Sequence, residues 1–319
     1  MKYEPLFMEP KFKDYIWGGK RLKQIFNKNV ENEDCTAESW EISTNEAGVS
    51  VIKNGELKNK TLIQVFNDTK YKLDIFGAKC QDLEEFPLLV KFIDANSNLS
   101  VQVHPNDEYA MENENSKGKT EMWYVLDCGN DAQIICGVKP ETTKETLQNK
   151  IENNKVIDVL NFVNVKKGDV IYIPAGTIHA LLGNTLVAEI QQNSNITYRV
   201  YDWDRVGTDG KPRQLHTKKA IDVIDVEKTP QITNAGNEIG IKNIIKSEYF
   251  EVEKINVKEK IQCTNVLDSF MAFCVVEGNG NIKINDEIYK ITKGDSFILP
   301  ACIKNYEVIG NVELLRAHL

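Results

Sequence analysis

Four residues of types that bind metal ions lie in two stretches of this chain. Gln102, His104 and Glu121 fall between positions 99 and 124, in a sequence that contains only four histidines. A second histidine, His179, follows a Gly-Asp turn, an apolar run and a Pro-Ala-Gly turn. Two neutral imidazoles, a carboxylate and an amide oxygen are suitable ligands for a divalent metal ion. The sequence therefore predicts a metal site built from these side chains.

The local pattern places the first three of these side chains on strands. Residues 99–104 alternate apolar and polar side chains, which predicts a strand with Gln102 and His104 on one face. Residues 121–126 are typical of a second strand. We expect this strand to lie beside the first, because that pairing brings Glu121 opposite the other two ligands.

The composition is that of a globular protein with a sizeable core. The chain has 319 residues, 41% of them hydrophobic and 27% charged, which fits one large or two ordinary domains. No apolar run approaches the roughly 20 residues of a membrane-spanning helix, and residues 1–15 lack the apolar core of a signal peptide. A net charge of −8 argues against nucleic acid or an anionic membrane as the main partner. A small anionic substrate stays compatible with it, because one phosphate needs only a local group of cations.

The seven cysteines indicate a reducing compartment. Their number is odd, they are scattered, and no two have CxxC spacing. Neither a disulfide framework nor a thiolate zinc site is therefore expected. We predict reduced thiols and a cytoplasmic location. The sequence carries no signal for an oligomeric state.

The predicted helices are few. Residues 60–77 have apolar side chains at helical spacing, with a cap at Thr61 and a glycine at the end, which predicts one amphipathic helix. Asn106 is placed to cap a short helix. Residues 139–162 show helical periodicity between β-like segments, so we interpret them as a helical insertion. Residues 215–225 predict one more helix.

The last part of the chain repeats the plan of the first part. Residues 270–278 align with residues 121–129, and residues 293–301 align with residues 167–175. The spacing between the two aligned segments is longer in the first copy by about the length of the proposed insertion. The repeat and the insertion therefore explain each other.

The second copy lacks the metal ligands. In this alignment Glu121 corresponds to Phe270 and His179 to Asn305, so we expect a single metal site in the chain. The ligands are then not required by the fold, which favours a functional role for them. With residues 229–243 as a linker that contains Pro230, Asn234, Gly236 and Gly240, we predict a metal-binding domain over residues 1–240 and a second domain without metal ligands over 241–319.

The motifs resemble a known family. Alternating strands, a Gly-Asp turn, a Pro-Ala-Gly turn and a ligand histidine resemble the cupin superfamily, in which two motifs supply metal ligands to the inside of a small β-barrel. A narrower resemblance, to the short bacterial form of the type I mannose-6-phosphate isomerases, covers nearly the whole chain. Four motifs carry it in the right order: LSVQVHP (99–105), GKTEMWY (118–124), GDVIYIPAGTIHAL (168–181) and EIQQNSNITYRVYDWDR (189–205). The resemblance implies a mainly β fold of two cupin-like (jelly-roll) β-barrels with a few helices.

The resemblance also implies an activity. Members of this family are zinc enzymes that interconvert D-mannose 6-phosphate and D-fructose 6-phosphate, an aldose–ketose isomerisation through an enediol-type intermediate. Carried over motif by motif, one Zn²⁺ per chain is expected on the four ligands Gln102, His104, Glu121 and His179. Arg199 corresponds to the catalytic arginine of the family.

Further site residues follow from the same resemblance. Ser100 and Lys119 match positions that line the substrate site. Glu189 matches by its sequence distance from Arg199, and Lys91 matches by its sequence distance from Ser100. We expect Lys119 to hold the phosphate, with help from Ser100 and Arg199. For the proton carrier, Glu189, Lys119 and a metal-bound water stay as alternatives. The resemblance assigns no role to Asp202, Asp204 or Arg205.

Two other functions fit part of the pattern. Two histidines and one carboxylate also suit iron(II), which would make the protein a cupin oxygenase. A non-catalytic sugar-phosphate sensor would retain the barrel and bind without turnover. The amide ligand and the cations Lys119 and Arg199 favour zinc and a phosphosugar. The non-catalytic alternative for Arg199 is a structural ion pair with Asp202 or Glu189.

Overall fold

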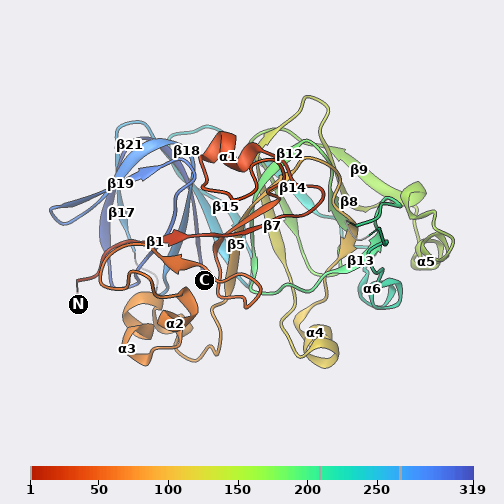
Figure 1. The fold of residues 1–319 in the computed structure, drawn as a ribbon, viewed down its shortest axis with the longest axis horizontal. Helices are drawn as coiled ribbons and strands as arrows, with labels where there is room; N and C mark the ends of the chain where they lie inside the picture. Colours follow the sequence, from red (N-terminus) through yellow and green to blue (C-terminus); the bar gives the residue numbers. More distant parts are fainter. Residues whose placement is uncertain (1, 208–209, 266–267) are drawn as a thin grey trace.

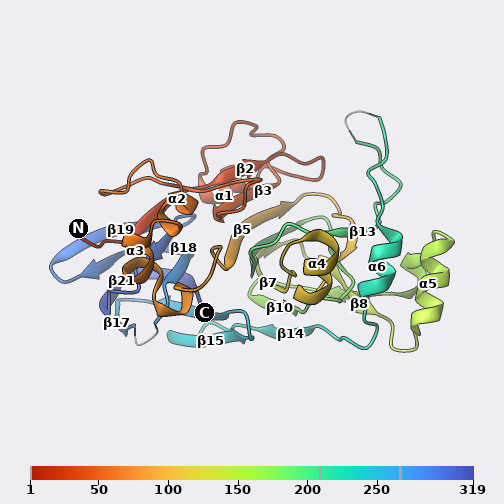
Figure 2. The same ribbon diagram turned by 90° about the horizontal axis from the view of Figure 1, so that it is seen from below.

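The computed structural model describes residues 2–207, 210–265 and 268–319, which form mainly antiparallel β-structure (Figure 1). The described strands assemble into three sheets of seven, five and nine strands. In both views the tail strands β17 and β19 lie at one end of the molecule, and β8 and α5 lie towards the other (Figures 1 and 2). The mainly β class predicted from the sequence is confirmed.

The seven-stranded sheet forms the centre of the molecule. Its strands follow the order β14–β10–β7–β12–β5–β3–β2, and neighbouring strands run antiparallel. The central strands β5 and β12 are buried along their whole length. The strands are β2 (Lys11–Lys13), β3 (Glu38–Ile42), β5 (Leu88–Ala95), β7 (Glu121–Cys128), β10 (Asp169–Ile173), β12 (Thr185–Gln192) and β14 (Gln231–Asn234).

The five-stranded sheet packs face to face against the seven-stranded sheet. One cluster of buried side chains joins them, with Trp123 and Val125 from the larger sheet and Ile134 and Leu181 from the smaller one. The order in the smaller sheet is β13–β6–β11–β8–β9. Its strands are β6 (Val101–Val103), β8 (Gln133–Val138), β9 (Leu160–Asn164), β11 (His179–Leu181) and β13 (Tyr198–Tyr201).

The nine-stranded sheet belongs mainly to the tail of the chain. Its path is β15–β16–β21–β18–β20–β1–β4, with β17 paired to β21 and β19 paired to β18. Strands β1 and β4 come from the N-terminal segment, so the two ends of the chain share one sheet. The strands are β1 (Leu6–Glu9), β4 (Val51–Ile52), β15 (Gly240–Lys246), β16 (Glu251–Val257), β17 (Lys260–Thr264), β18 (Met271–Ile284), β19 (Glu287–Thr292), β20 (Ser296–Leu299) and β21 (Asn305–His318).

The helices are short and lie outside the sheets. Asn106 caps α4 as predicted, because its side-chain oxygen accepts a hydrogen bond from the Tyr109 N–H. Within the described ranges no helix has the length and apolar character to cross a membrane. The α-helices are α1 (Arg21–Phe26), α2 (Leu62–Phe66), α3 (Thr69–Tyr71), α4 (Asp107–Glu114), α5 (Lys144–Glu152) and α6 (Thr217–Val223), with a π-helical turn at Lys72–Phe76 and 3₁₀ turns at Ala78–Cys80 and Val156–Val159.

The single helix predicted over residues 60–77 is wrong. The cap at Thr61 is present and accepts a hydrogen bond from the Gln64 N–H, but α2 ends at Phe66. Asp68 then adopts an extended conformation, and its side chain accepts a hydrogen bond from the Lys70 N–H. A short polar side chain that caps the next turn competes with the continuing helix, so the segment breaks into three short pieces.

The linker predicted over residues 229–243 is also wrong. Residues 231–234 form β14, which pairs with the edge of β10, and β15 begins at Gly240. Asn234 strengthens this pairing, because its side-chain N–H group donates to Asp169 Oδ1 over 2.7 Å. The free edge of β10 therefore outweighs the turn-forming composition of the segment.

The internal repeat is visible in the two Gly-Asp turns. The Gly168 N–H donates to the Val125 carbonyl over 2.9 Å, and the Gly294 N–H donates to the Val275 carbonyl over 2.8 Å. Both glycines have positive φ values, +87° and +93°, a conformation that L side chains rarely adopt. The two copies thus share the turn that feeds β10 in one and β20 in the other.

The pairing register corrects the sequence alignment by one residue. Glu121 pairs with Ile173, whereas Met271 pairs with Leu299, which aligns with Ile173. The counterpart of Glu121 is therefore Met271 and not Phe270. A shift of one residue turns a side chain to the other face of a sheet, and matching apolar residues cannot detect such a shift when both faces are buried.

Candidate metal centre and adjoining cavity

The four predicted ligands meet between the two facing sheets. Gln102 lies in β6 and His179 in β11, both in the five-stranded sheet, and His104 follows the end of β6. Glu121 opens β7 in the seven-stranded sheet. The expected pairing of the first two ligand strands is wrong, because β6 lies between β11 and β13. The connection that contains α4 carries the chain from one sheet to the other, so Glu121 faces the other ligands across the interior.

Two histidines and the carboxylate form a compact buried group. His104, Glu121 and His179 each present one ligand atom, and these atoms lie within 4.8 Å of one another. The distances from Nε2 to the carboxylate are 3.4 Å for His104 and 3.2 Å for His179. The Gln102 amide nitrogen lies 3.3 Å from His179 Nε2. A half-turn of the amide exchanges its nitrogen and oxygen, so Gln102 can present Oε1 at the same place.

The backbone fixes the orientation of both imidazole rings. Nδ1 of His104 lies 2.8 Å from the Ile196 carbonyl, and Nδ1 of His179 lies 2.8 Å from the Thr177 carbonyl. Because a carbonyl oxygen only accepts, each Nδ1 carries the proton. Each Nε2 then presents its lone pair towards Glu121. Such support by outer hydrogen bonds is usual for histidines that bind metal ions.

The protonation states suit metal binding. Burial, followed by the nearby Lys119 charge, lowers the pKa of His104 to about 3, so its imidazole is neutral. Burial by itself raises the pKa of Glu121, but Lys119 and His104 outweigh it and hold that pKa well below its ordinary value. The site therefore combines an ionised carboxylate with a neutral imidazole.

The Glu121 carboxylate provides a test of whether a cation fits here. Both of its oxygens are buried, and neither accepts a hydrogen bond from the described residues. Lys119 Nζ lies 2.9 Å from Oε2, but its hydrogen bond is with His104 Nε2, over 3.1 Å. A buried carboxylate without hydrogen bonds is costly. A divalent metal ion between this carboxylate and the two Nε2 atoms would remove that cost, so the residues fit such an ion.

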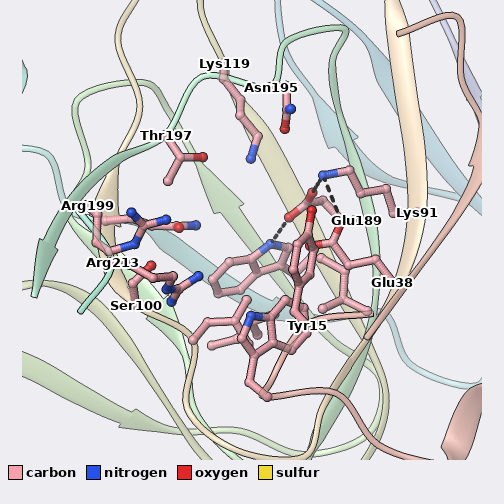
Figure 3. Close-up of a pocket in the computed structure, with 16 residues that line it drawn as sticks. Tyr15, Glu38, Lys91, Ser100, Lys119, Glu189, Asn195, Thr197, Arg199 and Arg213 are labelled. Carbon is pink, nitrogen blue, oxygen red and sulfur yellow. Dashed lines mark hydrogen bonds and ion pairs between the residues drawn. The ribbon is translucent and has the colours of Figure 1, made fainter. Parts of the chain in front are cut away.

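A cavity of about 290 Å³ adjoins the ligand group (Figure 3). Six of the nine predicted site residues line it, and the other three, His104, Glu121 and His179, are not among the lining residues. The lining residues are Tyr15, Trp17, Glu38, Lys91, Ile93, Leu99, Ser100, Gln102, Lys119, Trp123, Leu181, Glu189, Asn195, Thr197, Arg199 and Arg213.

Glu189 and Lys91 are direct neighbours across the seven-stranded sheet. Glu189 in β12 pairs with Lys91 in β5 and with Trp123 in β7, so the three side chains form one row. Trp123 Nε1 donates to Glu189 Oε2 over 2.9 Å, and Lys91 Nζ lies 3.1 Å from Glu189 Oε1 and 3.7 Å from Glu38 Oε2. Burial alone lowers the pKa of Lys91, but the two carboxylates outweigh it and raise that pKa. Lys91 therefore stays charged between two acids.

Arg199 is the cross-strand neighbour of Gln102, one of the four predicted ligands. It pairs with Gln102, which pairs on its other side with His179, so these residues form one row across β13, β6 and β11. The guanidinium is held by a hydrogen bond from Nη1 to the Gln214 carbonyl over 2.7 Å. The backbone thus directs Arg199 towards the metal group and the cavity.

The structural ion pair considered for Arg199 does not form among the described residues. Asp202 instead pairs with Arg205 and Arg213, at 2.7 Å and 2.6 Å. Glu189 is engaged with Lys91. The Arg199 guanidinium is thus free of a carboxylate partner in the described part of the chain.

Several cavity residues escaped the sequence analysis. Asn195 and Thr197 line the cavity together with Arg199, and their spacing of two residues was the signal that could have found them. Arg213 lies in a loop and gave no such signal. Trp17 stacks on Tyr15 with 5.4 Å between ring centroids, and both come from a segment to which the sequence analysis assigned no site residue.

Two facing antiparallel sheets with a His-Glu-His group between them define the class of this protein as a cupin-type fold with a candidate metal centre. The comparisons with known proteins agree. Residues 240–319 match the family model "Mannose-6-phosphate isomerase, cupin domain", and residues 6–134 match "Phosphomannose isomerase type I, catalytic domain".

Relatives of known sequence and structure match along the whole chain. A probable mannose-6-phosphate isomerase, GmuF of Bacillus subtilis, is 41% identical and covers 98% of this chain and 99% of its own length. Mannose-6-phosphate isomerase ManA of the same organism is 40% identical over the full length of both chains. The crystal structure of a mannose 6-phosphate isomerase from Bacillus subtilis has a TM-score of 0.90 at 36% identity and covers 99% of each chain. This chain belongs to the type I phosphomannose isomerase family, as the motifs indicated.

Proposed function

We propose that this protein is a zinc-dependent aldose–ketose isomerase that interconverts D-mannose 6-phosphate and D-fructose 6-phosphate through an enediol-type intermediate. The observation that carries the proposal is the ionised, buried Glu121 carboxylate that faces two oriented histidines beside a cavity with four cationic side chains. Family membership supports the choice of reaction, because the related proteins are named mannose-6-phosphate isomerases.

One Zn²⁺ per chain would be held by Gln102, His104, Glu121 and His179. When bound there, zinc supplies a Lewis acid that stabilises negative charge on the carbonyl and hydroxyl oxygens of the sugar. The other steps are assigned to side chains of the chain itself. Isomerisation requires removal of a proton at C2 and its return at C1, with charge developing on the neighbouring oxygens.

Arg199 is assigned to charge stabilisation. Its guanidinium stays protonated, so it cannot serve as the base. It lies next to Gln102 in the sheet and has no carboxylate partner among the described residues. A fixed positive charge at this place stabilises an oxyanion without reorganisation when the charge forms. Ser100, which also lines the cavity, is placed to donate to a substrate oxygen.

Glu189 is assigned to proton transfer. It lines the cavity, and its Oε1 accepts no hydrogen bond although Lys91 Nζ lies close by. Lys91 and the Trp123 N–H hold the carboxylate in place. Lys119 is the weaker candidate for the base, because it already contacts Glu121 and His104. We assign Lys119 to the metal side of the substrate, where its charge assists Arg199.

We also propose the domain division and the location. Residues 1–240 would form the catalytic domain, with a helical insertion near residues 139–162, and residues 241–319 would form a cupin-like domain without metal ligands. The helix α5 within the insertion and the replacement of Glu121 by Met271 support this division. All seven cysteines are free, which supports a reducing, cytoplasmic location and a role in carbohydrate metabolism.

The deciding experiment is isomerisation of mannose 6-phosphate, coupled to detection of fructose 6-phosphate. We expect activity that a chelator removes and that added zinc restores, with about one zinc per chain. Bound iron together with substrate-dependent oxygen uptake would contradict the proposal. So would binding of the sugar phosphate by the zinc-loaded protein without turnover.

A further inference from the structure

The geometry points to Arg213 as the residue that binds the phosphate of the substrate and makes the enzyme selective for phosphosugars, with Asp202 as its positioning residue. This inference rests on the proposed isomerase function and deepens it. Resemblance of motifs placed the phosphate on Lys119, Ser100 and Arg199 and assigned nothing to Arg213 or Asp202.

Arg213 is held rigidly at the cavity wall by two hydrogen bonds. Its Nε donates to Asp202 Oδ2 over 2.7 Å, and its Nη2 donates to Asp202 Oδ1 over 2.6 Å. Asp202 is buried, whereas the Arg213 side chain is 28% exposed. Nη1 has no hydrogen-bond partner within the ranges that the structure describes. A planar guanidinium anchored along one edge keeps its other edge for an anion, which is the geometry that phosphate recognition uses.

The two lysines of the cavity are engaged elsewhere. Lys119 Nζ lies within 3.1 Å of the metal ligands Glu121 and His104. Lys91 lies between Glu189 and Glu38. Lys119 therefore lies at the metal end of the cavity, and Lys91 lies at its acidic side.

The charges in the cavity are distributed unevenly. Figure 3 shows Arg199, Arg213 and Ser100 grouped at one side, and Lys91 and Glu189 at the other. Around Asp202 the arginines outnumber the carboxylate, because Arg205 and Arg213 share it and Arg199 has no acid of its own. On the opposite side Lys91 is shared by two carboxylates. A dianionic phosphate is favoured only at the arginine side, which leaves the uncharged sugar carbons facing the Glu189 side.

The pKa of Arg199 supports this arrangement. Burial lowers that pKa, and repulsion from the nearby Arg213 lowers it further. Two like charges held close together at a cavity wall are stabilised when an anion binds between them. The chain as a whole carries a net charge of −8, so this local excess of positive charge is not a general property of the surface.

The test compares two matched variants, Arg213→Gln and Arg205→Gln. Both remove a guanidinium that binds Asp202, but Arg205 donates to the Asn98 carbonyl and is not among the residues that line the cavity. For Arg213→Gln we expect KM for mannose 6-phosphate to rise about 10- to 100-fold, the worth of a hydrogen bond to a charged group, while kcat changes little. For Arg205→Gln we expect a change of less than about threefold. Asp202→Asn should raise KM with kcat retained.

Phosphate selectivity gives a second readout. The kcat/KM for unphosphorylated mannose should be the same in wild type and Arg213→Gln. The preference for the phosphorylated sugar should therefore fall by the factor by which KM for mannose 6-phosphate rises. Inorganic phosphate, titrated calorimetrically into the zinc-loaded protein, should bind about 10-fold or more weakly to Arg213→Gln. Equal phosphate affinity in both proteins, or equal losses in Arg213→Gln and Arg205→Gln, would overturn the inference. A wild type that binds phosphate through Arg213 but does not isomerise mannose 6-phosphate would overturn only the proposed function.

Discussion

The strand pair β7–β10 and the strand pair β18–β20 follow one plan, yet they enclose different interiors. In the tail, Met271 occupies the place of Glu121, and the rings of Phe273 and Phe297 stack with 4.8 Å between centroids. That interior is a packed apolar cluster. In the first pair the same position carries a buried carboxylate without hydrogen bonds, beside a cavity of about 290 Å³. The comparison teaches that the fold does not need the charge, so its retention in one copy reflects function.

The two copies also treat their interior arginines differently. Arg316 in the tail is buried and paired, with Nε 2.6 Å from Glu253 Oε2 and Nη1 2.6 Å from the Tyr306 hydroxyl oxygen. Arg199 donates to one backbone carbonyl and has no acid among the described residues. Breaking such a pair destabilises a protein, because it leaves the remaining charge uncompensated. The proposed role of Arg199 in charge stabilisation is consistent with this lack of an acidic partner among the described residues.

The largest expected effect comes from removing the charge that distinguishes the two copies. Glu121→Gln should lose the bound metal and lower kcat/KM by roughly a thousandfold or more, because the Lewis acid disappears with its anionic ligand. Metal content per chain and the coupled isomerase assay measure the two effects. The matched control, Met271→Leu in the tail, should leave both unchanged. A fully metal-loaded, active Glu121→Gln protein would refute the ligand assignment.

The second prediction contrasts the two arginines. Arg199→Ala should lower kcat by roughly 10²–10³-fold, as expected when a charge-stabilising donor is lost, with unchanged zinc content and thermal stability. Arg316→Ala should lower the free energy of unfolding by about 2–3 kcal/mol, because the half-buried Glu253 keeps only His318 as a partner and the Tyr306 hydroxyl loses its contact with Arg316. Activity per folded molecule should survive in that variant. If Arg199→Ala kept full turnover, the residue would have no part in the mechanism.

The smallest expected effect is a pH dependence of the metal-free protein. The pKa of His104 is about 3 in the folded state against an ordinary 6.5, so the unfolded state binds the proton first. Stability is therefore complete above pH 6.5 and is lost as the pH falls from 6.5 towards 3. In the tail, His318 and Arg316 outweigh the effect of burial and lower the pKa of Glu253 from 4.5. Protonation of this carboxylate therefore reduces the stability only below pH 4.5.

Thermal unfolding between pH 7.5 and 5 measures how much His104 contributes to the pH dependence of stability. His216 contributes with the same sign, because burial and Arg199 lower its pKa as well, so the Tm is best followed in a His216→Gln background. A Tm that does not change over this range in the metal-free protein would show that His104 does not stay neutral in the folded state. Added zinc should keep the Tm high down to a lower pH, because zinc binds the neutral imidazole.

Much of the site was predictable, and two of the failures share one cause. Side-chain chemistry and spacing identified Gln102, His104, Glu121 and His179, and motif resemblance added the residues that line the cavity beside them. The expected pairing of the ligand strands and the linker at residues 229–243 were wrong. Both depended on which strands pair over long distances, and local periodicity carries no information about that. Arg213 was missed because a loop residue has no periodic neighbours to mark it.

By itself the sequence determined the ligand types, the strand periodicity, the Gly-Asp turns and the lack of ligands in the second copy. These properties depend on the chemistry of single residues and on neighbours within a few positions. The tertiary structure alone decided that Glu121 faces the histidines across two sheets, that it lies one residue away from its aligned counterpart, and that Asp202 holds Arg213 at the cavity. Burial, charge compensation and strand register arise only when distant segments pack together, because each depends on atoms that the sequence separates by tens of residues.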